Sequence, residues 1–205
     1  MSDLRAYFEA LAERWDALQP LDRQEVLHRL VAPFDTLLGA SKAILEVGTG
    51  TGALILPLKE RAPTASLASI DLAGAMLERA RQREVDVLLV QADVHRLPFA
   101  PAVAAGAGFD LVVCHNSFPH FADKPVALLD LARVLQPGGH LLILHDLSRE
   151  RVNAIHSGAG GPIRNDLLPP GAETRQLLIE AGFTNVQVED TEEHYVAVGQ
   201  LLRPL

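Results

Sequence analysis

The sequence predicts an α/β domain in which helices alternate with strands to build a doubly wound, mostly parallel seven-stranded sheet. Two observations carry this prediction. Between residues 43 and 144, short apolar runs of strand length alternate with segments whose apolar residues recur at helical spacing. After residue 171, a helical segment is followed by two strands separated by a few residues, which predicts an antiparallel C-terminal hairpin at the sheet edge.

Composition limits the classes of partner. With 205 residues, 48% of them hydrophobic and 21% charged, the chain is long enough for one globular domain. Its 18 Lys and Arg against 26 Asp and Glu give a net charge of -8, so we expect no nucleic acid and no membrane as a partner. The lone Cys114 cannot form an internal disulfide and charges interrupt the N-terminal apolar run, which predicts a cytoplasmic location. Monomer and homodimer both remain open.

Residues 1–40 are expected to form an N-terminal helical lid, followed by the main domain over residues 41–205. Apolar residues recur at helical spacing at Leu4, Tyr7, Phe8, Leu11, Trp15 and Leu18. Pro20 is expected to end this helix, Asp22 and Glu25 to form a capping box for a second helix, and Pro33 to end that one. The aromatic residues of the first helix either cover a substrate or belong to the core.

The remaining elements follow in order along the chain. Strands are expected at residues 43–47, 65–70, 87–90, 109–113, 141–144, 186–189 and 195–201. Helices are expected to end near Arg61 and to span 73–83, 126–135 and 173–181. The insertion at 146–171 is polar, and its glycine run at 158–162 predicts a mobile substrate cover rather than a stable helix.

Three polar features follow the first three strands, at the edge where doubly wound sheets bind ligands. Residues 46–53 contain the pattern G-x-G-x-x-A, although a simple strand-to-helix turn would also carry glycines. Asp71 ends the second strand, 25 residues after Glu46, where a carboxylate can accept hydrogen bonds from ribose hydroxyls. Asp93 follows the third strand and can accept from an adenine amine. Each aspartate has the alternative of a helix cap or turn residue.

This ordered set resembles the motifs of class I S-adenosylmethionine-dependent methyltransferases over residues 41–145. The resemblance lies in residues 46–52, Asp71, Asp93, 109–113 and 135–139. The helix around Trp15 and Asp16 is similar to the lid helix of the small-molecule branch related to the quinone-biosynthesis (type 11) methyltransferases. The resemblance implies a Rossmann-like fold, S-adenosyl-L-methionine as cofactor, S-adenosyl-L-homocysteine as product, and direct methyl transfer to a small-molecule substrate.

The resemblance also implies cofactor contacts residue by residue. Glu46 and the glycine loop would hold the methionine portion, Asp71 the ribose and Asp93 the adenine amine, with the backbone near His115 facing the methionine amine. The full set of implied cofactor-binding residues is Glu46, Gly48, Thr49, Gly50, Gly52, Asp71, Leu72, Met76, Asp93, Val94 and His115. No lysine lies in the glycine loop, as suits a cofactor without phosphates.

Several of the eight histidines follow strands at this edge and carry three open interpretations. His120 and His145 are candidates for a catalytic base or for orienting the substrate. A divalent metal is possible but not favoured, because no close-spaced metal motif occurs; its candidate ligands are His115, His120, His145 and His156. The third interpretation is that these are loop histidines that orient one another at a pocket rim.

Two other function classes remain as alternatives. An NAD(P)-dependent oxidoreductase would fit the glycine pattern, but only Tyr7 and Tyr195 are tyrosines, and Gly199 stands where a catalytic lysine would follow Tyr195. A non-catalytic metal- or metabolite-binding protein on the same scaffold would use the histidines instead. We expect Cys114 to be a small buried thiol that lines the pocket, since direct methyl transfer needs no covalent intermediate.

Overall fold

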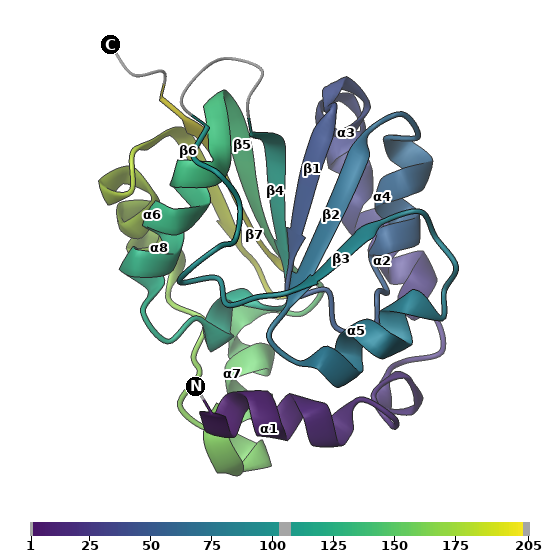
Figure 1. The fold of residues 1–205 in the computed structure, drawn as a ribbon. Coiled ribbons are helices and arrows are strands. Elements are labelled where there is room, and N and C mark those ends of the chain that lie inside the picture. Colours follow the sequence, from purple (N-terminus) through teal and green to yellow (C-terminus); the bar gives the residue numbers. More distant parts are fainter. Residues whose placement is uncertain (1, 103–107, 203–205) are drawn as a thin grey trace.

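The computed structural model describes residues 2–102 and 108–202, and in these residues seven strands form one sheet (Figure 1). The strands are β1 (Ala43–Val47), β2 (Ser66–Asp71), β3 (Leu88–Gln91), β4 (Phe109–His115), β5 (Leu135–His145), β6 (Phe183–Asp190) and β7 (Tyr195–Leu201). Their order is β3-β2-β1-β4-β5-β7-β6. Strands β1 to β5 pair in parallel and β7 is antiparallel to both its neighbours, which confirms the predicted sheet and its C-terminal hairpin.

Alternating residues of the parallel strands face two separate cores, because successive side chains of a strand point to opposite faces. On one face, Ile44 and Leu111 pack with α2 (Arg23–Val31), α3 (Asp35–Ala40) and α4 (Ile55–Arg61). On the other face, Leu45 and Val112 pack with α6 (Lys124–Val134) and α8 (Gly171–Glu180). This two-sided burial explains why the strands are apolar nearly throughout.

Strand order reverses between β1 and β4, which lie side by side at the centre of the sheet. In open α/β sheets, a ligand crevice forms at this point, beyond the carboxyl ends of the strands. Helix α5 (Gly74–Arg81) follows β2, and α1 (Ser2–Leu11) crosses the same end of the molecule (Figure 1). The fold therefore places the N-terminal segment over the carboxyl ends of the parallel strands, where the polar motifs lie.

The N-terminal segment differs from its prediction in two details. Helix α1 ends at Leu11 rather than near Pro20, and only a short 3₁₀ turn, η1 (Asp16–Leu18), follows. The capping box is wrong: Asp22 has φ -89° and ψ 10°, outside the extended conformation of a side-chain cap, and its side chain makes no capping hydrogen bond. Helix α2 does end before Pro33, as predicted.

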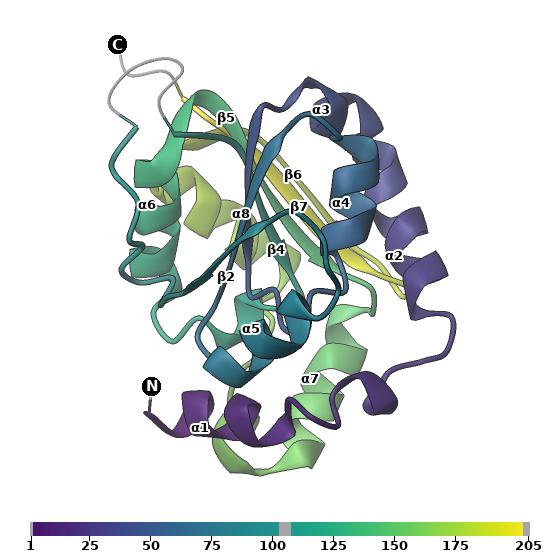
Figure 2. The ribbon, with the colours of Figure 1, turned by 45° about the vertical axis from the view of Figure 1, so that its right-hand side comes forward.

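The insertion also differs, because residues 149–159 form a helix, α7 (Arg149–Ala159). The Ser148 side chain caps it, and Val152 and His156, four residues apart, bury one face. That spacing outweighs the helix-breaking tendency of the glycines, and Gly160, with φ +67°, ends the helix. Helices α1 and α7 lie at the same end of the molecule in both ribbon views (Figure 2).

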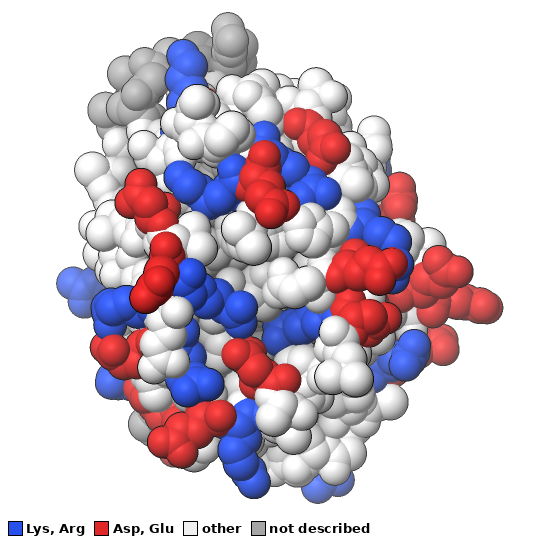
Figure 3. Space-filling model, turned by 90° about the vertical axis from the view of Figure 1, so that its right-hand side faces the viewer, with Lys and Arg blue, Asp and Glu red and all other residues white. Residues whose placement is uncertain are grey.

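The boundaries of the two predicted segments, residues 1–40 and 41–205, include Met1 and residues 203–205, which lie outside the described residues. Residues 137–139 fall inside β5, where the pairing with β4 shifts register between Phe109 and Leu111. Acidic and basic side chains are interspersed across the face shown in Figure 3. In the part of the chain that the structure describes, the helices lack the length and apolar character needed to cross a membrane.

Candidate functional site

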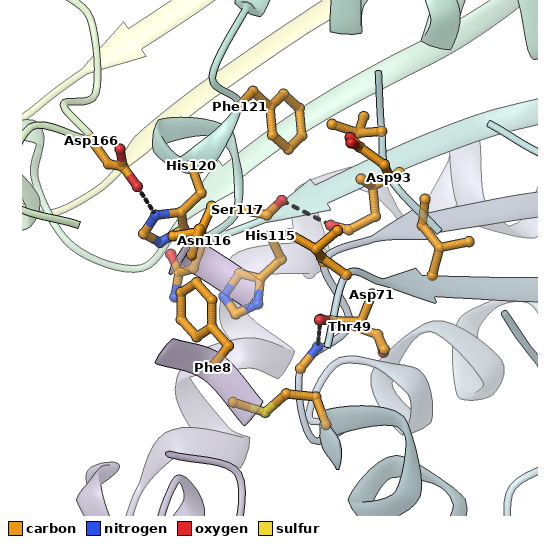
Figure 4. A pocket seen from close by; sticks show the side chains of 18 of the residues that line it. Phe8, Thr49, Asp71, Asp93, His115, Asn116, Ser117, His120, Phe121 and Asp166 are labelled. Atoms are coloured by element: carbon orange, nitrogen blue, oxygen red, sulfur yellow. Dashed lines mark hydrogen bonds and ion pairs between the residues drawn. The ribbon is translucent and has the colours of Figure 1, made fainter. Parts of the chain in front are cut away.

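A cavity of about 430 Å³ lies beyond the carboxyl ends of β1, β2 and β4, at the point where the strand order reverses (Figure 4). Most of the predicted site residues line it: Gly48, Thr49, Gly50, Asp71, Leu72, Met76, Asp93, Val94, His115 and His120. Four others, Glu46, Gly52, His145 and His156, lie outside its lining. One cavity therefore brings together residues from every motif that follows the first four strands.

The glycine loop after β1 has positive φ angles, +76° at Gly48 and +80° at Gly52. A Cβ on Gly48 would fall 2.4 Å from the Cβ of Ser117, in the loop after β4. A Cβ on Gly52 would lie 3.0 Å from the Cβ of Ala80 on α5. Both positions therefore require glycine for backbone conformation and for close packing, and they hold the loop at the cavity wall.

Glu46 lies behind this loop and is 1% exposed. Its Oε2 accepts hydrogen bonds from Thr49 Oγ1 at 2.8 Å and Ser69 Oγ at 2.7 Å. Burial raises the pKa of the Glu46 carboxyl, and these two hydrogen bonds oppose the rise. Glu46 thus fixes Thr49, which itself lines the cavity, and places a carboxyl group beneath the loop.

Asp71 ends β2 and faces the cavity. Its Oδ2 accepts a hydrogen bond from the Gly50 N–H at 2.8 Å and its Oδ1 accepts one from the Ala73 N–H at 2.9 Å. Burial raises the pKa of the Asp71 carboxyl against these hydrogen bonds. Since each carboxylate oxygen can accept a second hydrogen bond, Asp71 can also bind two adjacent hydroxyls.

Asp93 follows β3 and is both a turn residue and a cavity residue. Its Oδ1 accepts from the backbone N–H of His95 at 2.9 Å and lies 2.6 Å from His95 Nδ1. His95 Nε2 in turn accepts from the Asp123 N–H at 3.1 Å, so the proton of a neutral His95 ring lies on Nδ1. Its place in a turn therefore does not prevent Asp93 from accepting a hydrogen bond from a ligand in the cavity.

Helix α1 closes one side of the cavity with Phe8 and is joined to α5 by Glu9. The two Glu9 carboxylate oxygens accept from the backbone N–H groups of Gly74 at 2.9 Å and Ala75 at 2.8 Å, at the start of α5. The hydrogen bond from Ala75 is the largest cause of the lowered pKa of Glu9. This arrangement pairs a carboxylate with a helix N-terminus and fixes the N-terminal segment over the site.

Arg23 and Asn116 also line the cavity, although neither was predicted as a site residue. Arg23 is the one Lys or Arg among the described lining residues, and its buried Nε has no hydrogen-bond partner. Asn116 Nδ2 donates to Asp146 Oδ1 at 2.6 Å, while the buried Asn116 Oδ1 is unpartnered. Asn116 directly follows β4 and could have been found by its place at the sheet edge; Arg23 lies on α2, where no motif distinguishes it.

The four candidate histidines occupy different environments. His115 lines the cavity, and burial lowers its pKa to about 4. His120 lines it too, with Nδ1 2.8 Å from Asp166 Oδ2, and its ring centroid lies 4.8 Å from that of His156. His145 is 1% exposed and packs against Tyr195, with 6.1 Å between ring centroids. Burial lowers the pKa of His145 well below its usual range.

His145 interacts electrostatically with His115, His120 and His156. Over residues 2–102 and 108–202, no group of three or more His, Cys, Asp or Glu side chains is arranged to hold a metal ion. Cys114 lies on β4 and is buried in the core as expected, but it does not line the cavity, contrary to expectation. Burial raises the pKa of its thiol, so a reactive thiolate is not favoured there.

Comparison with known proteins places the chain among methyltransferases. Residues 45–143 match the family model described as "Methyltransferase domain". A demethylmenaquinone methyltransferase of Thermus thermophilus is 40% identical over 143 residues, 67% of this chain and 63% of that protein. A malonyl-[acyl-carrier protein] O-methyltransferase of Geobacter sulfurreducens is 34% identical over 173 residues, 78% of this chain and 63% of that protein.

The chain thus covers about three fifths of the length of these relatives. Among solved structures, a SAM-dependent methyltransferase from Aquifex aeolicus superposes with a TM-score of 0.70 at 20% identity. The match covers 93% of this chain and 98% of that one. At this identity the likeness concerns the fold, and it extends over nearly the whole of both chains.

Proposed function

The chain belongs to the class I S-adenosylmethionine-dependent methyltransferases, and from this membership we propose that it transfers a methyl group to a small-molecule acceptor. One observation carries the proposal beyond the family: a single cavity brings the glycine loop, Asp71 and Asp93 together. A ligand made of an amino acid, a ribose and an adenine needs these three groups in this sequence along β1, β2 and β3.

The polar atoms of the cavity fit that cofactor. Arg23 Nε and Asn116 Oδ1 are buried without partners, and they offer a cationic donor and an acceptor to a carboxylate and an ammonium group. The other charged lining residues, Asp3, Asp71, Asp93 and Asp166, are all acidic. S-adenosylmethionine supplies a methyl group activated by a positive sulfonium charge, which an acidic cavity tolerates.

We assign each part of the cofactor to residues of the cavity. Asp71 would bind the ribose hydroxyls and Asp93 the adenine amine, assisted by the backbone N–H of Val94, while Leu72 and Met76 would flank the adenine. Gly48, Thr49, Gly50 and the backbone near His115 would contact the methionine portion. Glu46 and Gly52 would act from behind the loop, through the hydrogen bond to Thr49 and the packing on Ala80.

Catalysis would rest mainly on position. Holding two reactants in line can contribute about 7 to 11 kcal/mol, because translational and rotational freedom is already lost before the reaction. Residues 1–40 would act as a lid through Phe8 and Trp15, and residues 146–171 would complete the cover through Pro162 and Asp166. Both covers would exclude water from the acceptor.

The proposal is tested with S-adenosylmethionine carrying an isotopically labelled methyl group, which is incubated with the protein and a small-molecule fraction of a metabolite extract. We expect labelled methyl groups in a small-molecule product, identified by mass spectrometry. S-adenosylhomocysteine binding without labelled product would favour the non-catalytic binding protein. Binding of NADPH in place of S-adenosylhomocysteine would favour the oxidoreductase.

A further inference from the structure

The His120 ring is held in one orientation at the cavity wall (Figure 4). It ends the 3₁₀ turn η3 (Phe118–His120), after β4, and its Nδ1 lies 2.8 Å from Asp166 Oδ2. An ionised carboxylate can only accept hydrogen bonds, so Nδ1 carries the proton and Nε2 of the neutral ring carries a lone pair. Among the described residues, Nε2 has no protein hydrogen-bond partner.

Helices α1 and α7 restrain this pair. The Phe8 ring from α1 meets the His120 ring edge-on, with 5.1 Å between centroids. His156 from α7 also contacts the His120 ring, with 4.8 Å between centroids, and its Nδ1 donates to the backbone oxygen of Asp166. Asp166 is thus fixed by both its side chain and its backbone, and it fixes His120 in turn.

We propose that His120 is the general base of the methyl transfer and Asp166 its positioning residue, so that the acceptor is a hydroxyl compound with a planar, apolar body. This inference rests on the proposed function and specifies the substrate class of the same site. Phe8 and Trp15, which also line the cavity and contact one another at 5.9 Å between centroids, provide an aromatic wall for such a body.

The chemistry balances without a further reactant. The acceptor hydroxyl gives its proton to His120 Nε2, and the oxygen lone pair forms the new bond to the methyl carbon. The electron pair of the broken carbon–sulfur bond stays on the sulfur, which becomes a neutral thioether. His120 then releases its proton to solvent. A carboxylate acceptor has already lost its proton and would gain nothing from this base.

Other ionisable groups act on His120 and enter any pH profile. Asp166 and His156 contact it directly, and Asp71 and His145 interact with it electrostatically from the ends of β2 and β5. Lys124, at the start of α6, interacts with Asp166. The test therefore compares acceptors of different acidity at one pH, so that these surrounding groups stay in the same state.

The experiment measures methyl transfer to phenol and to 4-nitrophenol at a pH where only the second is ionised, with benzoate as a carboxylate probe. The variants are His120→Gln, Asp166→Asn and Asp166→Glu, and the matched control is His194→Gln, in the β6–β7 turn and outside the cavity lining. We expect His120→Gln to lower kcat for phenol by about 10²-fold or more. The loss for 4-nitrophenol should be much smaller, and KM for S-adenosylmethionine should change by less than about twofold.

Asp166→Asn should lower kcat for phenol in the same direction and Asp166→Glu should restore part of it, whereas His194→Gln should change neither rate. An equal loss of kcat for both phenols in His120→Gln would overturn the inference, because the effect of a purely structural residue does not depend on the acidity of the acceptor. Two further outcomes would overturn the inference in a protein that binds S-adenosylhomocysteine. One is methylation of benzoate without methylation of either phenol, and the other is methylation of none of the three compounds. Failure of wild-type protein to bind S-adenosylhomocysteine would instead reject the proposed function.

Discussion

Thr51 of the glycine loop donates a hydrogen bond to Asp16 of the N-terminal segment, with 2.5 Å between Thr51 Oγ1 and Asp16 Oδ1. Arg83 Nη2 also lies 3.3 Å from Asp16 Oδ2, and its Nε donates to the Thr51 backbone oxygen. Hydrogen bonds to an ionised group are stronger than neutral ones. This contact therefore connects the segment that covers the cavity to the loop that lines it.

Removing this connection should free the cover. We expect Asp16→Ala to speed the release of S-adenosylhomocysteine, because η1 would no longer be attached to the loop, while the sheet stays folded. Stopped-flow displacement would give the release rate, and hydrogen exchange over residues 2–18 would show the loosened segment. Asp22→Ala is the control, since Asp22 is exposed and caps nothing. An unchanged release rate in Asp16→Ala would contradict this role for the contact.

Asp93 should select adenine over hypoxanthine. Its carboxylate can accept from the adenine amine, whereas the oxygen of hypoxanthine would face it with a second acceptor. Wild-type protein should bind S-adenosylhomocysteine at least about tenfold more tightly than S-inosylhomocysteine, and Asp93→Ala should lose most of this preference. Calorimetric titration of both ligands measures it, with exposed Asp86→Ala as control. The same preference in Asp93→Ala would show that the adenine lies elsewhere.

Arg23 should recognise the cofactor's carboxylate. Arg23→Gln is expected to weaken S-adenosylmethionine binding by about tenfold to a hundredfold, the usual range for a hydrogen bond to a charged group. Decarboxylated S-adenosylmethionine should bind both forms alike, because it lacks the carboxylate. Arg29→Gln, on the exposed face of α2, is the control. Equal weakening for both ligands would mean that Arg23 acts on the fold or on another part of the ligand.

Much of the fold was predictable because two of its determinants are local. The strands from residue 43 to 144 are buried on both faces, which produces continuous apolar runs, and the loops that follow β1, β2 and β3 carry Gly48, Asp71 and Asp93. In a parallel sheet the carboxyl ends of all strands meet at one edge. Sequence order alone therefore placed most of the predicted residues at one cavity.

The remaining parts of the cavity wall depend on contacts between segments that are distant in the sequence. The pairs Asp16–Thr51, His120–Asp166 and Asn116–Asp146 are separated by 35, 46 and 30 residues. The spacing of apolar residues along the sequence cannot predict contacts between residues that are so far apart in the chain. The helix at 149–159 was not predicted because Gly158 and the polar residues obscure the four-residue spacing of Val152 and His156, which becomes significant only when a neighbouring surface covers these two side chains.

His145 should make the folded state sensitive to acid. Burial lowers its pKa well below the usual value and lowers that of His115 to about 4. The unfolded chain takes up these protons near pH 6.5 and the folded chain only at lower pH, so stability falls as pH drops from about 6.5 toward 4. Each such histidine contributes up to about 1.4 kcal/mol per pH unit.

His145→Phe removes one of these groups, so its stability should fall less between pH 7 and pH 5 than that of wild-type protein. Urea unfolding at the two pH values gives the difference. The raised pKa values of Glu46 and Asp71 act in the opposite direction, but they are common to both proteins and cancel. His194→Gln, in the exposed hairpin turn, should keep the wild-type slope. A wild-type slope in His145→Phe would contradict the buried neutral state of His145.

The most direct measurement is thermal unfolding with S-adenosylhomocysteine, for wild-type protein and for Asp71→Asn. A ligand at 100 times its Kd stabilises by about 2.7 kcal/mol, and each kcal/mol raises Tm by about 2 to 4 °C in a chain of this size. We predict a rise of several degrees in wild-type protein, little rise in Asp71→Asn of unchanged circular dichroism, and none with NADPH. No rise with S-adenosylhomocysteine, or an equal rise in Asp71→Asn, would contradict the placement of the cofactor in this cavity.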